Sequence, residues 1–375
     1  MATVPRQRMF DPTSSDHGLR PGTGPASGTI GGSDRGFARL EAAKRGFCLR
    51  RVDVRVATLL GRQYAPEAGS LFLARVTELG HHTRIELPDG RRARLFAGDE
   101  VVACYGHRYA PDQYGIRVPE HMQRCALATS GGVAGELESR HDAVGRPTML
   151  QPIGMLGDLS GAPLNLTRFA LPPVERCPVQ VPVFAVLGSS MNSGKTTTAA
   201  CTVRGLTNAG MRVAAAKITG TGSGADYWHM LDAGAIAVRD FSDCGLPSTF
   251  RVDLQTLQRT FFTLLSELQR SAPDAIVIEI SDGLFQRETA MMVAAPWFRD
   301  AVDKVLLAAP DAMALATGVE ILRRHALSVA ALSGLVSRSP LAMQEAAEQT
   351  GLRVLDIAGL ESPEIVTPLL FSLGR

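Results

Sequence analysis

One short segment, residues 183–200, constrains the fold more than any other part of the chain. It reads Val-Phe-Ala-Val-Leu-Gly-Ser-Ser-Met-Asn-Ser-Gly-Lys-Thr-Thr-Thr-Ala-Ala, an apolar run followed by a loop of small residues and a helix-forming stretch. The apolar run predicts a buried strand, and the loop leads the chain into the N-terminus of a helix. Backbone N–H groups at such a turn form a concave site for anions. The segment therefore predicts a phosphate-binding loop.

Two side chains at the start of the predicted helix suit the phosphates of a nucleotide. Lys195 is placed to reach the β- and γ-phosphates, and the hydroxyl of Thr196 is placed to ligate Mg²⁺. We therefore expect ATP or GTP, together with Mg²⁺, as the cofactors. The residues predicted to bind the nucleotide are Gly188, Ser189, Asn192, Ser193, Gly194, Lys195, Thr196 and Thr197.

The loop departs from the usual phosphate-loop pattern at its first glycine. That pattern places a glycine six residues before the lysine, but Ser189 occupies this position and Gly188 comes one residue earlier. The alternative interpretation is an ordinary strand–turn–helix that contains Gly-Lys-Thr by chance. The flanking strand and helix favour a nucleotide site.

From about residue 181 onward, short apolar runs alternate with longer segments of helical spacing. Residues 254–268, for example, carry leucine or phenylalanine every three or four positions. This alternation predicts an α/β fold with a parallel sheet and helices on both faces. The expected strands are Val181–Leu187, Arg212–Ile218, Ala235–Phe241, Ala275–Ile280, Lys304–Ala308, Ser328–Leu332 and Arg353–Ile357.

The chain before residue 181 has a different pattern. Residues 1–45 are rich in Gly, Ser and Thr without apolar periodicity, so we expect a disordered or loosely ordered arm. Residues 46–180 hold short apolar runs, one of them Val52–Leu60, separated by turn signals such as Asp89-Gly90. They predict a small antiparallel β domain, as a sheet or a barrel, with a proline-containing linker from about residue 136. The predicted nucleotide-binding domain follows at 181–375.

Three further charged residues stand at or just after the ends of predicted strands: Lys217, Asp226 and Glu279. Ligands of open parallel sheets bind at the carboxyl ends of the strands, so we expect these side chains to converge on Lys195. Mg²⁺ prefers an octahedral shell of oxygen ligands. The predicted metal ligands are Thr196, Asp226 and Glu279, and the predicted catalytic residues are Lys195, Lys217 and Glu279.

Each of these assignments has a plainer alternative. Lys217 has the alternative of a surface lysine, and Asp226 has that of an N-cap for the following helix. Glu279 follows four apolar residues and would be buried without a cation, so a role as metal ligand or water activator is favoured. Asp282 is either a catalytic base or part of a plain turn.

Several other polar residues keep two interpretations. Glu288, Asp240 and Asp243 have the same ambiguity between a site and a turn. His229 is expected in packing or at the surface. His81-His82 lies in a predicted hairpin turn, without the Cys or His spacing of a metal site.

The segment Tyr105–Tyr114 is dense in aromatic and hydrogen-bonding side chains for a loop. Loops on a rigid β scaffold often bind ligands, although an ordinary surface hairpin loop fits equally well. If the first domain leans over the phosphate loop, Arg108 and Tyr109 contact an anionic substrate in the cleft between the domains. A small, anionic molecule is therefore the expected partner.

Four motifs, in order along the chain, resemble those of known P-loop enzymes. Gly188, followed after five residues by Gly194-Lys195-Thr196, is similar to the loop of dethiobiotin synthetase. Residues 216–220 are similar to the segment where that enzyme keeps a second active-site lysine. Residues 224–227 and 275–279 resemble segments of cobyrinic acid amide synthetases that carry a metal-site aspartate and glutamate. The resemblance implies an Mg²⁺–NTP-dependent ligase.

The two-domain layout carries a second resemblance. It is similar to an uncharacterised P-loop family with a small N-terminal domain, and this similarity includes the segment Asp99–Gly135. Some relatives in that family are linked to N-acylation of D-amino acids. This resemblance bears on the architecture more than on the reaction.

Charge, hydropathy and cysteine content exclude several classes of protein. Thirty-nine Lys and Arg residues oppose 37 Asp and Glu residues, a net charge of +2 without the basic excess of a nucleic-acid binder. No apolar stretch approaches the roughly 18 residues that span a bilayer. The six cysteines are scattered and form no C-x-x-C pair, which favours a reducing, cytoplasmic setting. We expect neither a nucleic-acid nor a membrane partner, and a homo-oligomer remains open.

The predicted function is activation of a small carboxylate-bearing substrate by phosphoryl transfer, as in ligases and synthetases. Such chemistry depends on positioning and charge stabilisation, which the predicted groups provide. One alternative is a GTP- or ATP-hydrolysing accessory protein for maturation of a cofactor or an enzyme. Another is an N-acyltransferase that uses a CoA thioester and holds the CoA phosphates in the loop. The sequence does not choose between ATP, GTP and CoA.

Overall fold

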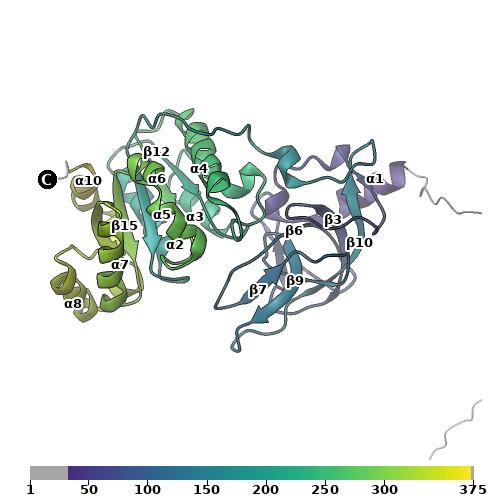
Figure 1. Ribbon diagram of the computed structural model, residues 1–375, viewed down its shortest axis with the longest axis horizontal. Coiled ribbons are helices and arrows are strands. Elements are labelled where there is room, and N and C mark those ends of the chain that lie inside the picture. The colour runs from purple at the N-terminus through teal and green to yellow at the C-terminus, as the bar shows by residue number, and fades with distance from the viewer. Residues whose placement is uncertain (1–32, 373–375) are drawn as a thin grey trace, which may run out of the picture.

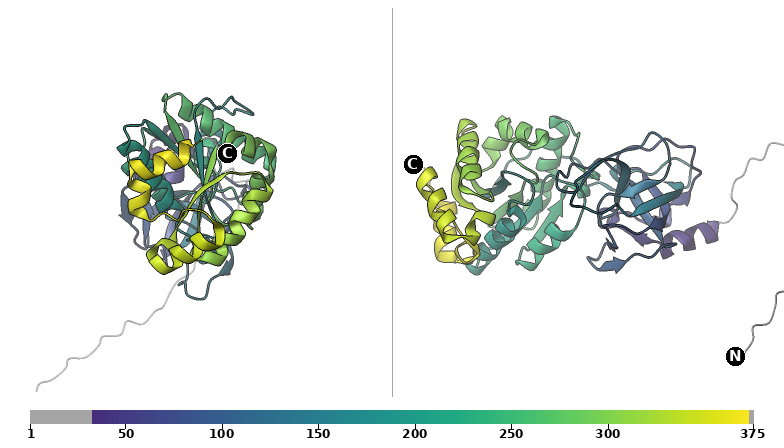
Figure 2. Two further views of the ribbon diagram at one scale, coloured as in Figure 1. Left: turned by 90° about the vertical axis from the view of Figure 1, so that its left-hand side faces the viewer. Right: turned by 90° about the horizontal axis from the view of Figure 1, so that it is seen from below.

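The computed structural model describes residues 33–372, which form two lobes side by side (Figures 1 and 2). The first lobe is mostly β-sheet, and the second is a sheet covered by helices (Figure 1). Helix α1 (Ser33–Ala42) lies at the outer end of the first lobe, and α10 (Pro363–Phe371) lies at the opposite end of the molecule. Residues 1–32 of the predicted arm lie outside the described residues.

For residues 33–45, the prediction of a disordered or loosely ordered arm is wrong. Residues 33–42 form α1, and Lys44–Arg45 (β1) pairs with β6 (Glu100–Tyr105) in parallel register. Leu40 is fully buried in the core of the first lobe, and the Arg39 guanidinium donates to Glu100 at 2.7 Å. A few contacts of this kind hold a segment whose composition alone indicates disorder.

The strands of the first lobe close into a ring. Pairing runs β6–β3–β10–β8–β9 and returns from β9 to β6, with β1, β2 and β7 attached at its edges. The pairs are antiparallel except β1–β6 and β6–β9, which agrees with the predicted antiparallel β region. The strand bounds are β2 (Thr58–Leu59), β3 (Leu71–Glu78), β7 (Tyr114–Arg117), β8 (Cys125–Leu127), β9 (Val133–Arg140) and β10 (Met149–Gly157).

A separate hairpin of β4 (Arg84–Glu86) and β5 (Arg92–Arg94) turns at Asp89-Gly90, as the sequence predicts. Gly90 adopts φ 87°, a left-handed conformation that suits glycine, and a Cβ there would meet the Trp228 ring of the other lobe. The hairpin turn is therefore pressed against the second lobe.

Two expectations for the first lobe are corrected. Only Thr58–Leu59 of the strand expected at 52–60 pairs, because Asp53 caps a short 3-10 helix at Val54–Val56. The expected linker contains most of β9 and all of β10. Pro152 lies within β10 beside a shift in register, where a β-bulge tolerates the missing N–H, so the prolines do not exclude a strand.

The second lobe is built on a parallel sheet of six strands within the described residues. Their order is β13–β12–β14–β11–β15–β16, and each pair is parallel. The bounds are β11 (Val183–Gly188), β12 (Val213–Lys217), β13 (Ala237–Asp240), β14 (Ala275–Glu279), β15 (Lys304–Ala308) and β16 (Val329–Ser333). The predicted α/β fold is confirmed.

Helices cover both faces of this sheet, each above its own apolar core. One face carries α2 (Lys195–Asn208), α3 (Ala225–Asp232), α9 (Ile357–Glu361) and α10. The other carries α4 (Leu254–Gln269), α5 (Arg287–Ala294), α6 (Pro296–Ala301), α7 (Ala312–Arg324) and α8 (Pro340–Thr350). Among residues 33–372, no helix is both long and apolar enough to cross a bilayer.

The prediction of a strand at Arg353–Ile357 is wrong. Val354 makes one isolated bridge to Leu332 of β16, and the chain then enters α9. Asp356 caps this helix, since its carboxylate accepts a hydrogen bond from the Gly359 N–H at 2.8 Å. The capping aspartate ends the extended run before a seventh strand forms.

Hydrogen bonds join the two lobes at the carboxyl ends of the parallel strands. The Thr129 hydroxyl donates to the Gly222 carbonyl at 2.7 Å, and the Glu86 carboxylate accepts from the Gly224 N–H at 2.9 Å. Gly222 and Gly224 belong to the loop between β12 and α3. The first lobe thus contacts the sheet edge where side chains were predicted to converge.

Candidate functional site

The predicted phosphate loop connects β11 to α2, at the centre of the parallel sheet. Asn192 and Gly194 both adopt left-handed backbone conformations, with φ 58° and 100°. A Cβ on Gly194 would lie 2.8 Å from the Cα of Gly334, so only glycine fits there. Such a turn before a helix N-terminus exposes successive N–H groups to an anion.

The displaced glycine of the loop has a steric reason. A Cβ on Gly188 would come within 2.7 Å of the Lys195 side chain and 2.3 Å of the Ser193 hydroxyl. The lysine stem therefore crosses directly over Gly188. Ser189, one residue later, is partly exposed and does not need to be glycine.

Lys195 is buried, and its ammonium donates to the Ser190 carbonyl of the same loop at 2.7 Å. Burial lowers the pKa of this lysine, an effect that Glu279 and Asp282 partly offset. The hydroxyls of Ser189 and Ser193 are buried and have no hydrogen-bond partner among the described residues. Such unpartnered hydroxyls are able to donate hydrogen bonds to phosphate oxygens.

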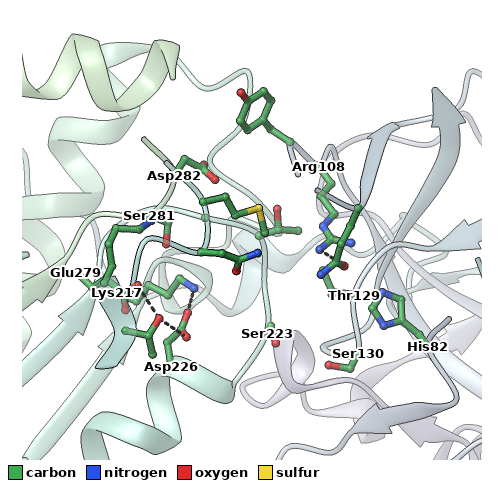
Figure 3. A pocket seen from close by; sticks show the side chains of 18 of the residues that line it. His82, Arg108, Thr129, Ser130, Lys217, Ser223, Asp226, Glu279, Ser281 and Asp282 are labelled. Carbon is green, nitrogen blue, oxygen red and sulfur yellow. Dashed lines mark hydrogen bonds and ion pairs between the residues drawn. The ribbon is translucent and has the colours of Figure 1, made fainter. Parts of the chain in front are cut away.

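The Thr196 hydroxyl lies between two carboxylates. Its Oγ1 is 2.9 Å from Oδ1 of Asp226 and 3.0 Å from Oε1 of Glu279. Lys217 forms an ion pair with the other oxygen of Asp226. All the residues predicted for the metal and for catalysis thus line one cavity, and Figure 3 shows Lys217, Asp226 and Glu279 together.

Strand register places two of these groups side by side. Lys217 and Glu279 are paired Cα partners at the last positions of β12 and β14. Lys217 is only 7% exposed, so the surface-lysine alternative is wrong. Asp226 lies in the first turn of α3, whose N-cap is Gly224, so the N-cap alternative is wrong as well.

The two carboxylates of the cluster titrate in opposite directions. Burial and the nearby Asp226 raise the pKa of Glu279 to about 7. Burial opposes ionisation of Asp226, but Lys217 outweighs it and lowers the pKa of this carboxyl. A single hydroxyl proton cannot serve two acceptors, so a protonated Glu279 that donates to Thr196 fits the cluster without metal.

A magnesium ion fits the residues present. Glu279 Oε2 is buried without a hydrogen-bond partner among the described residues, while Oε1 of the same carboxylate lies 3.0 Å from the Thr196 hydroxyl. Two carboxylates and one hydroxyl supply half of an octahedral oxygen shell, and phosphates and water commonly supply the rest. No group of three or more His, Cys, Asp or Glu side chains suited to a metal lies within residues 33–372. The protein ligands of such an ion would be Thr196, Asp226 and Glu279.

A cavity of about 640 Å³ opens over this cluster and reaches the first lobe. Figure 3 shows Glu279, Lys217, Asp226 and Asp282 on one side, and Arg108, Thr129, Ser130 and His82 on the other. Its lining also includes Arg84 and Arg92 of the β4–β5 hairpin, with His81, Tyr109 and Gln113. The cavity has the size of a small-molecule site and is bounded by both lobes.

The predicted loop at 105–114 contacts the phosphate loop directly. Asn192 donates a hydrogen bond through its amide to the Asp112 carboxylate. Tyr109 is 38% exposed, and its ring lies 5.5 Å from that of Phe250 between centroids. The first lobe therefore leans over the phosphate loop, and both Arg108 and Tyr109 line the cavity.

Asp282 also lines the cavity, in the loop that follows β14. Its φ of 64° is left-handed, and burial raises the pKa of its carboxyl to about 6, partly offset by Lys195. A Cβ on the neighbouring Gly283 would lie 2.3 Å from the Ser189 carbonyl, so this turn packs against the phosphate loop. Asp282 forms a turn and faces the site at once.

The remaining candidates have structural contacts. Asp240 and Asp243 form a capping box, and Asp243 pairs with Arg50 at 2.7 Å. Glu288 is buried and accepts from the Arg251 N–H at 2.9 Å. His229 lies on α3 and is not among the residues that line the cavity.

Sequence reasoning missed the contribution of the hairpin to the cavity. Arg84 and Arg92 belong to an arginine-rich segment around the Asp89-Gly90 turn, which was the available signal. Of the two turn histidines, His82 is half-buried and its Nε2 lies 3.0 Å from the Ala128 carbonyl. Burial lowers the pKa of His82 to about 4, so this ring is neutral at physiological pH.

Comparisons with known proteins give a likeness of fold. No protein-family model matches the chain, and no curated protein matches it. A solved structure of the signal recognition particle 54 kDa protein from Aeropyrum pernix K1, in complex with GDP, is 16% identical with TM-score 0.36 over 52% of this chain. The receptor FtsY from Elizabethkingia anophelis is 15% identical over 52%, with TM-score 0.30.

A DUF1611 family protein from Anabaena variabilis is 12% identical over 53% of this chain, with TM-score 0.35. The matches span 47%, 57% and 62% of the three proteins' own lengths. These are distant similarities of fold, and they identify no specific family.

Proposed function

We propose that this chain is an Mg²⁺–NTP-dependent enzyme that transfers the γ-phosphoryl group to a small carboxylate-bearing substrate, in the manner of a ligase or synthetase. The observation that carries the proposal is the Thr196 hydroxyl, held between Asp226 and Glu279 beside Lys195 at the floor of a two-lobed cavity. A hydrolase needs only water beside its nucleotide. A cavity walled by a second lobe favours a second substrate.

We call the part of the cavity lined by Lys195, Thr196, Lys217, Asp226 and Glu279 the phosphate end, and its residues have separate roles in binding. The loop N–H groups and Lys195 would hold the β- and γ-phosphates, with Ser189 and Ser193 offering hydroxyl donors. Thr196, Asp226 and Glu279 would hold Mg²⁺, which when bound neutralises phosphate charge in the transition state. Lys217 is fixed by Asp226 and is placed to neutralise charge on the acceptor or on the acyl phosphate.

A carboxylate acceptor suits the protonation states of the site. An oxygen of the ionised acceptor forms a bond to the γ-phosphorus, and the bond between this phosphorus and the β–γ bridging oxygen breaks. The products are an acyl phosphate and a nucleoside diphosphate, and no proton has to be removed. Asp282, whose pKa lies near 6, is then required only when water or an amine is the acceptor.

Trapping of the acyl phosphate tests this reaction. The protein would be incubated with Mg-ATP or Mg-GTP, a pool of small carboxylic acids and hydroxylamine, which converts acyl phosphates to hydroxamates. We expect hydroxamate to form in step with nucleoside diphosphate, and only when an acid is present. Inorganic phosphate released at the same rate without any acid would contradict the proposal and identify a hydrolase. Acetyl-CoA binding without any nucleotide binding would instead support acyl transfer.

A further inference from the structure

Arg108 lies on the side of the cavity that is formed by the first lobe, opposite the parallel sheet (Figure 3). It is 6% exposed and follows β6, where its backbone bridges to Ile116 of β7. Its guanidinium donates to the Ala128 carbonyl and, at 2.8 Å, to the Gln113 side chain. Both partners are neutral, and no carboxylate of the described residues lies within 4.0 Å in an ion pair.

A buried guanidinium without a counterion is unusual, because burial of an unpaired charge is unfavourable. Burial lowers the pKa of Arg108 to about 10, and Asp112 partly opposes this shift. The group therefore stays charged at neutral pH. An anion bound in the cavity would supply the missing negative charge.

Two arginines of the β4–β5 hairpin extend this wall. Arg84 and Arg92 line the same cavity, and neither forms an ion pair among the described side chains. Glu86, the Cα partner of Arg92 across the hairpin, is instead buried against the second lobe, where it accepts from the Gly224 N–H at 2.9 Å. Glu86 therefore bonds to the second lobe and forms no ion pair with Arg92. We call Arg84, Arg92 and Arg108 the arginine wall.

Arg108 lies across the cavity from Lys217, Asp226 and Glu279 (Figure 3), and Arg84 and Arg92 line the same cavity. At the phosphate end, Lys217 already has a carboxylate partner. A molecule that reacts at one end and is held at the other needs a charged group at each.

We propose that the arginine wall binds a second carboxylate of the acceptor substrate, remote from the carboxylate that receives the phosphoryl group. The substrate class is then a small dicarboxylic acid, and the inference rests on the proposed function for the identity of the first carboxylate. Thr129, Ser130 and the imidazole of His82 lie on the same side of the cavity as Arg108 (Figure 3) and are neutral, so none of them pairs with its charge.

Calorimetric titration of the full chain, saturated with Mg-ADP, tests the inference. The probes are succinate, glutarate and adipate, each compared with the monocarboxylate of equal carbon number: butyrate, valerate and hexanoate. We expect at least one dicarboxylate to bind ten times or more tighter than its matched monocarboxylate. Charge-assisted hydrogen bonds of this kind contribute roughly 10- to 100-fold in affinity.

Substitutions locate the second carboxylate. Arg108→Gln is expected to lower the affinity for the preferred dicarboxylate roughly 10- to 100-fold and to leave the affinity for Mg-ADP within twofold. Arg84→Gln and Arg92→Gln, at exposed positions, are expected to act in the same direction with smaller effects. Arg94→Gln is the matched control, because Arg94 lies on the same hairpin but does not line the cavity.

Three results would overturn the inference. The first is equal affinity for each dicarboxylate and its matched monocarboxylate. The second is a loss of Mg-ADP or Mg-ATP affinity in Arg108→Gln, which would assign this arginine to the nucleotide. The third is unchanged dicarboxylate affinity in the double variant Arg84→Gln/Arg92→Gln. This variant provides the test if Arg108→Gln does not fold. Absence of any nucleotide binding by the wild type would contradict the proposed function instead.

Discussion

The two ends of the cavity solve the same electrostatic problem in opposite ways. At the phosphate end, the buried Lys217 ammonium is matched by Asp226, and the cluster is closed by hydrogen bonds through Thr196. At the arginine wall, the buried Arg108 guanidinium meets only neutral acceptors. Lys217 is thus paired with a carboxylate of the protein, whereas Arg108 has no ion-pair partner among the described residues. The contrast teaches that burial of a cation alone does not define its role; its partners do.

The largest expected effect concerns the phosphate end. Lys195→Ala is expected to lower the affinity for Mg-ATP on the order of 100-fold or more, because two phosphates lose a charge-assisted donor. Calorimetric titration measures the affinity, and circular dichroism checks that the fold is intact. Lys304→Ala, at the start of β15 and away from the cavity, is the control. Unchanged affinity in Lys195→Ala would remove the loop from the nucleotide site.

A second prediction tests the contrast itself through stability. Lys217→Met leaves the mostly buried Asp226 carboxylate without its partner, and we expect the free energy of unfolding to fall by about 3–5 kcal/mol. Arg108→Met removes a cation that has no counterion, and a change within about 1 kcal/mol is expected. Urea denaturation of both variants without ligand measures the difference.

The double variant Lys217→Met/Asp226→Asn serves as the control for this pair, and it should recover part of the stability lost in Lys217→Met. Equal destabilisation by Lys217→Met and Arg108→Met would break the contrast between the two ends. So would full stability of Lys217→Met.

The smallest expected effect is a pH dependence that arises from Glu279. Its pKa is about 7 in the folded protein, above the usual value near 4.5, so the folded state binds more protons between these pH values. Stability without metal is therefore expected to fall as pH rises from about 4.5 to 7, on the order of 1–3 kcal/mol. Glu279→Gln should flatten this profile, as should saturating Mg-ADP. A Glu279→Gln profile identical to that of the wild type would assign the dependence to another group, such as Asp282.

The phosphate end was predictable from the sequence because its geometry is local. A strand, a small loop and a helix follow one another within residues 183–200, so backbone chemistry fixes where Lys195 and Thr196 lie. Lys217 and Glu279 were found by their positions at strand ends, which parallel register brings together. What the sequence could not show was the ion pair of Lys217 with Asp226, which depends on the angle at which α3 leaves its loop.

The arginine wall was less predictable because it is assembled from distant parts of the first lobe. Arg84 and Arg92 lie on the two strands of the hairpin, and Arg108 reaches the cavity only after the strand ring has closed. One strand of that ring, β10, was missed because Pro152 favours a linker when read in isolation. Pairing with β3, which is distant in the sequence, stabilises β10 as a strand, and local propensity does not predict such a pairing.

The most direct test of the account is a crystal structure of the full chain with a non-hydrolysable ATP analogue and Mn²⁺ in place of Mg²⁺. We predict an anomalous peak for manganese within bonding distance of the Thr196 hydroxyl, and a γ-phosphate in contact with the Lys195 ammonium, which has left the Ser190 carbonyl. A nucleotide bound elsewhere, or a phosphate loop with Thr196 still bonded to both carboxylates and no metal beside it, would contradict the account.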